Sequence, residues 1–201
     1  MKKNVLNTCL SVAALLFAAC GGVPQTFYYR IDYEVQNSKV GDAALPVTLG
    51  VTQFDADVLY QGDRLVYRNS PYEVQFYNYR RWIAPPRRIV TEKILKQFQA
   101  SGLFQRVVRT PSSFKVDYVL SGRIRAFEEW DEAVAWYGIV TLDLQLKSAS
   151  THSIVWEQEY TQKTKAAQKD PLEIVRAIST SLRKVVQSGI QGVEQHLKAS
   201  I

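Results

Sequence analysis

The residue types that most often carry catalysis are sparse in this sequence of 201 residues. Its two histidines, His152 and His196, have no cysteine, histidine or acid beside them at the spacing of a metal site. The sequence has no Gly-x-Ser-x-Gly elbow and no Gly-x-x-x-x-Gly-Lys-Ser/Thr loop. We therefore predict no catalytic residues, no metal ligands and no enzyme activity. A hydrolase whose triad forms only in space is a less favoured interpretation.

One acidic run resembles an acid/base or metal site by composition. It contains Glu128, Glu129, Asp131 and Glu132 around Trp130. The run falls between two strand-like segments, where polar residues usually form a connection. We predict a solvated loop here.

The first 20 residues have the composition of an export signal. Lys2 and Lys3 precede a short apolar stretch from Val5 to Phe17, and small residues come directly before Cys20. This leader resembles the lipoprotein signals cut by signal peptidase II, although Phe17 occupies a position where leucine is usual. An ordinary secretory signal with an incidental cysteine is the alternative. We expect residues 1–19 to be removed and Cys20 to carry lipid such as palmitate, with no other cofactor.

The cysteine count supports this interpretation. Cys9 lies inside the leader, so Cys20 would be the only cysteine of the mature chain, and an internal disulfide would be excluded. A lone thiol is a liability in an oxidising compartment, and lipidation removes it. No apolar stretch after residue 20 is long enough to span a membrane.

The residues after Cys20 favour a location close to one membrane. Gly21 stands where, by resemblance to enterobacterial sorting, aspartate would retain a lipoprotein in the inner membrane, so the outer membrane is favoured. Residues 20–26 form a short tether, and its six residues after Cys20 reach ~20 Å when extended. We expect the domain of residues 27–201 to face the periplasm beside its membrane.

The stretch Tyr72–Arg88 is unusually rich in aromatic and arginine side chains, which are enriched in interface hot spots. One interpretation is a partner-binding surface, and the other is a strand with an aromatic inner face followed by a helix start. Single-stranded nucleic acid uses the same residue types, but an exported protein rarely meets it. Two of the six net positive charges lie in the leader, so the mature chain is only mildly basic and no nucleic-acid partner is predicted. The candidate partner-binding residues are Tyr72, Phe76, Tyr77, Tyr79, Arg80, Arg81 and Trp82.

Periodicity predicts a single α/β domain of the α+β type, a mainly antiparallel sheet with two principal helices packed on it. The expected helices are 85–101 and one beginning at Pro171, with Asp170 as its N-cap. The apolar face of the second helix is expected to pack on the sheet, with partner binding or membrane contact as the alternative. The expected strands are 27–33, 46–54, 64–68, 73–77, 103–108, 116–127, 134–146 and 154–160, the last three as a meander.

The order of several segments resembles the ABC-type transport auxiliary lipoproteins, which include the lipoprotein component of paraquat-inducible and related Mce-type lipid transport systems. The resemblance runs through most of the mature chain. Its segments are Phe27–Arg30, Val47–Phe54, Leu65–Arg68, Tyr72–Val74, Tyr79–Trp82, Pro85-Pro86, Ser101–Phe104 with Val107, and Asp117–Leu120 with Gly122 and Ile124.

The resemblance implies an α/β fold and a non-enzymatic role. The implied partners are an Mce-domain protein and an ABC permease and ATPase, with lipid or another hydrophobic compound as cargo between the inner and outer membranes. A ring-shaped homo-oligomer is an additional expectation. Of the functional residues, only Cys20 is carried over. A stand-alone periplasmic lipid-binding carrier or an envelope assembly factor is the alternative function.

Overall fold

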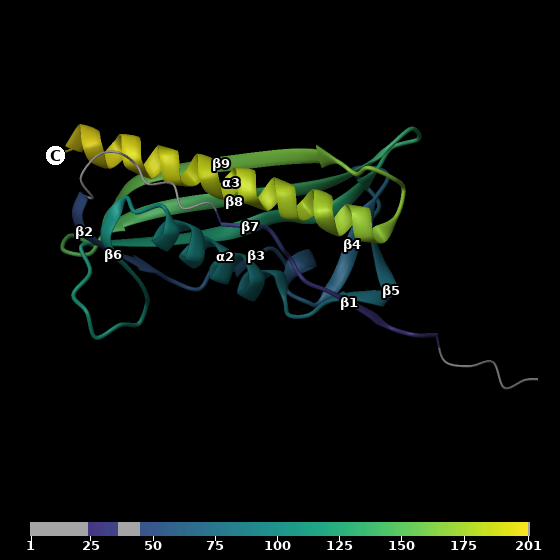
Figure 1. Cartoon of the computed structure of the whole chain (residues 1–201), viewed down its shortest axis with the longest axis horizontal. Helices are drawn as coiled ribbons and strands as arrows, with labels where there is room; N and C mark the ends of the chain where they lie inside the picture. The colour runs from purple at the N-terminus through teal and green to yellow at the C-terminus, as the bar shows by residue number, and fades with distance from the viewer. Residues whose placement is uncertain (1–23, 36–44, 201) are drawn as a thin grey trace, which may run out of the picture.

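The computed structural model describes residues 24–35 and 45–200 and contains one curled sheet with two helices (Figure 1). The described part has nine strands in that sheet. In chain order the elements are β1 (Phe27–Tyr29), β2 (Leu45–Val51), β3 (Asp55–Ala56), the 3-10 turn η2 (Val58–Tyr60), β4 (Arg64–Arg68), β5 (Gln75–Trp82), α2 (Pro86–Ala100), β6 (Phe104–Arg109), β7 (Tyr118–Asp131), β8 (Trp136–Ser148), β9 (Ile154–Lys165) and α3 (Pro171–Ser200).

The three longest strands form the predicted antiparallel meander. Strand β8 pairs with β7 along one edge and with β9 along the other. Along its other edge, β7 pairs in succession with β2, β3 and β4. Strand β6 lies beyond β2, and β5 and then β1 lie beyond β4. The single-domain α+β fold is thus confirmed. The parallel pairings of β1 with β5, β2 with β6, and β7 with β2 and β4 were not predicted.

Helix α3 packs lengthwise on the sheet, as its periodicity predicts. Asp170 is its N-cap, because its Oδ1 accepts the Leu172 amide at 2.8 Å. The helix lies over β8 and β9 (Figure 1). The residues that form its apolar face recur every three or four positions and are all buried: Val175, Ile178, Leu182, Val185, Gly189, Val193 and Leu197. None of the helices among the described residues is long and apolar enough to cross a membrane.

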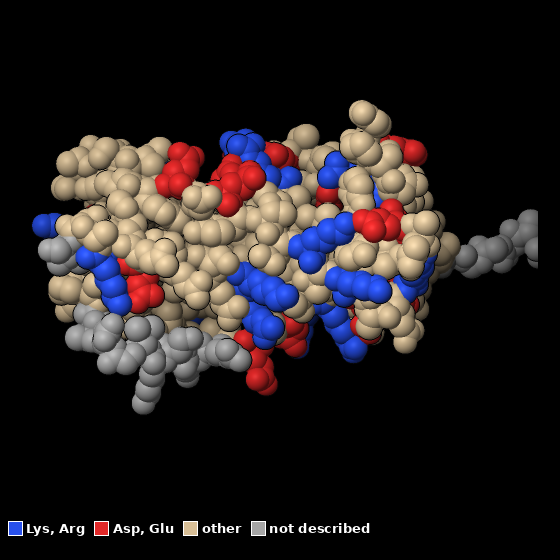
Figure 2. Space-filling view, turned by 90° about the horizontal axis from the view of Figure 1, so that it is seen from above, with Lys and Arg blue, Asp and Glu red and all other residues tan. Residues whose placement is uncertain are grey.

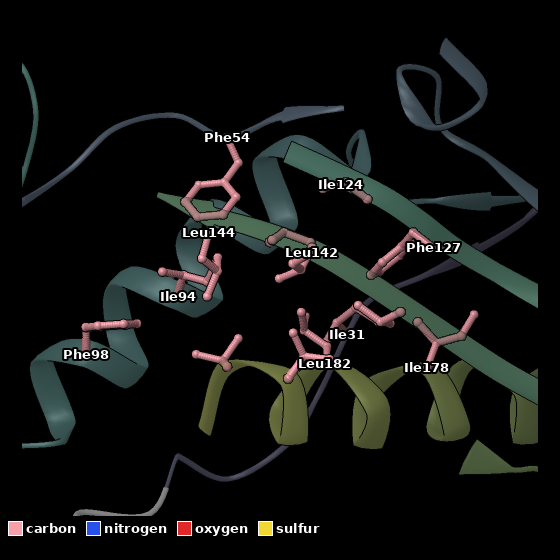
Figure 3. Close-up of a cluster of buried hydrophobic side chains, with 14 of the residues drawn as sticks. Ile31, Phe54, Ile94, Phe98, Ile124, Phe127, Leu142, Leu144, Ile178 and Leu182 are labelled. Carbon is pink, nitrogen blue, oxygen red and sulfur yellow. The ribbon is translucent and has the colours of Figure 1, made fainter. Parts of the chain in front are cut away.

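The core lies between the sheet and both helices. Ile94 and Phe98 of α2 join Leu142 and Leu144 of β8 and Leu182 of α3 in one buried cluster (Figure 3). Helix α2 begins at Pro86, within a residue of its predicted start, because Pro85 and Pro86 fit the first turn of a helix.

Two strand predictions need correction. The predicted strand 27–33 stops at Tyr29, because the chain then crosses the helices: the Asp32 amide lies 3.4 Å from Ser179 Oγ of α3, and Tyr33 Oη donates to Gln97 of α2 at 2.7 Å. In β7, predicted as the strand 116–127, the register shifts between Ile124 and Ala126, so the regular alternation of a strand breaks there.

Candidate functional site

The predicted anchor and the predicted partner surface are separated by a short length of chain. Residues 1–23, which include the predicted signal peptide and Cys20, lie outside the described residues. The described chain begins at Pro24 and enters the sheet as β1, which pairs in parallel with β5. Strand β5 contains most of the predicted partner-binding residues. The fold therefore brings β1, which begins seven residues after Cys20 in the sequence, against the aromatic–arginine stretch.

The predicted hairpin at residues 64–77 is present, and β5 extends to Trp82 because β1 covers its second half. Tyr72 lies in the turn between β4 and β5 with 96% of its surface exposed. It is the most accessible of the seven predicted residues.

Several other members of the predicted set serve the fold. Trp82 is only 1% exposed, and its ring centroid lies 5.0 Å from that of Phe127 in the core. Phe76 is partly buried beneath the Arg64 guanidinium, which lies 4.5 Å from the ring centroid. Arg81 forms a salt bridge with Asp63 at 2.8 Å. Trp82 therefore cannot contact a partner directly, and Arg81 is already paired.

Tyr77 and Arg80 belong to a buried polar cluster around Glu129. Tyr77 Oη donates to the carboxyl group at 3.2 Å from each oxygen, and its ring packs on Tyr67 with centroids 4.7 Å apart. The Arg80 guanidinium lies 5.0 Å from the Tyr77 ring centroid. Burial and the neighbouring Asp131 raise the pKa of Glu129 to about 9. The Glu129 carboxyl group is therefore mostly neutral at neutral pH.

The acidic run is thus not a solvated loop, and that prediction was wrong for its first half. Glu128 and Glu129 lie within β7 and are each 1% exposed. Glu128 accepts hydrogen bonds from Tyr60 Oη at 2.5 Å and from Arg68 Nε at 3.0 Å. Buried carboxylates need such partners, so this cluster has a structural explanation without metal or catalysis. Within residues 24–35 and 45–200, no group of three potential ligands could hold a metal ion.

The outer surface of β1 and β5 has an exposed apolar edge that the sequence analysis only partly identified. We call it the β1–β5 edge and define it by its exposed side chains, which are Phe27, Tyr28, Tyr79 and Ile83. Tyr28 pairs with Arg81, so Tyr79 and Ile83 precede and follow its partner by two residues. Only Tyr79 belonged to the predicted set. An apolar Ile83 beside the Pro85-Pro86 helix start was the signal that could have identified this edge.

A second exposed group lies at the turns of the sheet. Strand β4 runs parallel to β7, with Arg68 paired to Trp130, so the turn that contains Tyr72 lies near the β7–β8 turn. Val134 in that second turn is also highly exposed. Lys169, just before α3, donates to the Ala133 carbonyl at 2.6 Å and brings the start of α3 to the same end (Figure 1).

Polar side chains line part of the outer face of β7, β8 and β9. A shallow hollow on the β7–β8–β9 face is lined by charged side chains that include Arg123, Arg125 and Asp143. Figure 2 shows several basic side chains across the middle of the visible face, with acidic side chains among and around them.

Solved structures show the same fold at low sequence identity. A protein from Xanthomonas campestris is 18% identical and has a TM-score of 0.77, covering 87% of this chain and 100% of its own. An uncharacterized protein is 13% identical with a TM-score of 0.66, covering 85% and 99%. A hypothetical protein from Chlamydia trachomatis is 7% identical with a TM-score of 0.51, covering 77% and 99%. At such identities the likeness concerns the fold alone. No curated protein matches the sequence.

The family is shown by the sequence itself. A family model described as the ABC-type transport auxiliary lipoprotein component matches residues 29–188. The match runs from the last residue of β1 to the middle of α3 and includes the hairpin and the acidic cluster. The chain therefore belongs to the family of ABC-type transport auxiliary lipoprotein components.

Proposed function

We propose that this protein is a lipid-anchored accessory of an ABC-type system that moves lipid or another hydrophobic compound between the inner and outer membranes. The observation that carries the proposal is the family match over residues 29–188, on a domain that presents Tyr72 at an accessible turn. The protein acts by position rather than by catalysis: Cys20 holds it on the outer membrane, facing the periplasm. An Mce-domain protein and an ABC permease and ATPase are the proposed partners.

The exposure of individual residues narrows the proposed partner surface. Tyr72 is accessible in the β4–β5 turn, and Val134 and Leu172 are exposed at the same end of the sheet. Large side chains at turn tips bury little surface within the folded domain, whereas binding to a partner could bury them. We assign partner contact to this turn end, while Phe76, Tyr77 and Trp82 hold the hairpin that presents Tyr72.

Affinity purification from a gently solubilised envelope tests the proposed function. We expect the lipidated chain to fractionate with membranes and to co-purify with an Mce-domain protein or another component of an ABC transport system. The Cys20→Ser chain should fold but leave the membrane fraction, because it lacks the acylation site. Recovery of the lipidated chain without any such component would contradict the proposed function.

A further inference from the structure

The β1–β5 edge exposes more apolar surface than a three-residue strand requires. Tyr28 is 64% exposed and Ile83 is 68% exposed, and the half-exposed Tyr79 lies on the same face, whereas the half-exposed Phe27 is paired with Arg80 and faces the other side of this edge. Only Ala84 and Pro85 separate Ile83 from the first residue of α2, so Ile83 lies close to the helix start. Exposed apolar side chains that gather on one strand edge, three of them on the same face, mark a surface that meets a partner or a membrane.

The length of the preceding chain restricts what can meet this edge. Six residues separate Cys20 from Phe27, and a chain of that length extends to about 20 Å at most. If Cys20 carries lipid, Phe27 and Tyr28 cannot leave the neighbourhood of the membrane surface. Ile154 at the start of β9 is also exposed, but it lies at the opposite end of the long strands from β1 and β5 (Figure 1).

The charges around the edge fit anionic lipid headgroups. Arg87 and Arg88 are exposed in the first turn of α2 and form no salt bridge within the described part of the chain. Glu92, one turn after Arg88 on α2, is already paired with Arg109, and Asp63 is paired with Arg81 of β5. Free guanidinium groups next to exposed aromatic rings suit a surface of anionic lipid.

We propose that the β1–β5 edge lies in the headgroup region of the membrane that carries the Cys20 lipid, which makes this edge a second, non-covalent membrane contact. The proposal rests on the anchoring that the proposed function includes. Tyrosine rings favour the membrane–water interface, where their apolar bodies and hydroxyl groups are both accommodated. Strand β1 pairs only with β5 among the described strands, so its outer backbone groups need water and the contact stays at headgroup depth. The contact would fix the orientation of the domain and hold its turn end toward a partner.

A fluorescence experiment on the lipidated mature protein in vesicles tests this contact. Once Cys20 is acylated, a substituted cysteine is the only free thiol, because Cys9 lies in the leader. Ile83→Cys and Ile154→Cys are each labelled with the environment-sensitive dye NBD, the second as a control at the opposite end of the sheet. The vesicles contain phosphatidylglycerol, with or without brominated acyl chains. We expect a blue shift and quenching by bromolipid at position 83, and neither at position 154.

A charge reversal separates headgroup recognition from simple proximity. Arg87→Glu with Arg88→Glu should reduce the quenching at position 83 in phosphatidylglycerol vesicles and leave it unchanged in phosphatidylcholine vesicles. Equal quenching loss in both kinds of vesicle would contradict the role given to these arginines.

Flotation of the same vesicles distinguishes failure of the contact from failure of the anchor. Protein that floats but shows no quenching at position 83, or equal quenching at positions 83 and 154, overturns the membrane contact and leaves the anchor standing. Protein that does not float overturns both. A blue shift at position 83 that appears without vesicles and grows with protein concentration shows that a second copy covers the edge, which also overturns the proposal.

Discussion

Glu128 and Glu129 are neighbours on β7, yet both are buried, and their carboxyl groups meet different partners on opposite faces of the sheet. Glu128 is bound by Tyr60 and Arg68, whereas Glu129 is bound by Tyr77. Glu129 is paired with Gly138 of β8, and a Cβ at Gly138 would point at α3, so Glu129 lies on the face of the sheet that α3 covers. The two carboxyl groups therefore stabilise the same strand in different ways, and they give different predictions.

The raised pKa of Glu129 predicts a stability that falls as pH rises. Because the folded protein holds this proton up to about pH 9 while the unfolded chain loses it near 4.5, the folded state binds more protons between those values. This group therefore contributes its full stabilisation below about pH 4.5, and the contribution is lost as the pH rises to about 9. Glu129→Gln should flatten this slope, as measured by urea unfolding across the pH range.

The control for that experiment is Glu132→Gln, which also removes one acid but at an exposed position paired with Lys163. It should leave the pH slope close to that of the parent protein. If Glu129→Gln has the same slope as the parent, the carboxyl group is ionised in the folded state and its assignment as neutral is incorrect.

Removing Arg68 should leave the buried Glu128 carboxylate without its charged partner. We expect Arg68→Met to lower the free energy of unfolding by about 3–5 kcal/mol, because a buried charge loses its compensation. Adding Glu128→Met and Tyr60→Phe should recover most of this loss, since the polar group and its donors are removed together. Chemical denaturation measures both variants.

The surface pair of Arg176 with Glu173 provides a matched control, since both residues lie in the first turns of α3 and Arg176 is well exposed. Arg176→Met should cost less than ~1 kcal/mol. Equal losses for Arg68→Met and Arg176→Met would show that the Glu128 pair does not depend on burial.

Gly138 sets the distance between β8 and α3. A Cβ at this position would lie 2.4 Å from the Ile178 backbone nitrogen, so Gly138→Ala forces the helix away from the sheet. We expect a loss of about 1–3 kcal/mol in unfolding free energy, as for other overpacked sites. Gly62→Ala is the control, because a Cβ there meets nothing within 4 Å. A tolerated Gly138→Ala would contradict the tight packing of α3.

Asp170 should stabilise the protein only by capping the N-terminus of α3. Asp170→Ala removes the side chain that accepts the Leu172 amide and should cost about 1 kcal/mol, whereas Asp170→Asn should retain most of the cap. Thermal unfolding followed by circular dichroism measures the three proteins. Identical midpoints for alanine and asparagine would show that the cap is not used.

The elements with strong local signals were predictable from the sequence. The α3 cap and its apolar spacing, the prolines that begin α2, and the alternation in β8 each depend on neighbouring residues. The parallel pairings were not predictable in this way, because the contact of β4 with β7 or of β1 with β5 joins segments far apart in the chain. The sequence pattern also concealed the irregular register near Ala126, which shifts the alternation and lets Phe127 reach the core.

The candidate site was predictable only in part for the same reason. The composition of residues 72–88 identified the correct hairpin but did not separate Tyr72, which is exposed, from Trp82, which is buried. The partners of Trp82 and Tyr77 come from β7, about 50 residues later. Glu128 and Glu129 were assigned to a loop because four acids around one tryptophan usually mark solvent exposure, whereas their burial depends on Arg68 and Tyr77.

Site-specific photo-crosslinking in the intact envelope tests the transport-accessory role most directly. A photo-reactive amino acid replaces Tyr72 at the turn end, and in a parallel chain it replaces Ile154, which is 47% exposed at the far end of the sheet. The predicted result is a crosslinked product between position 72 and an Mce-domain protein or an ABC permease, with no such product at position 154. A lipidated, membrane-bound chain that gives no transporter product from position 72, or the same products from both positions, would contradict the account.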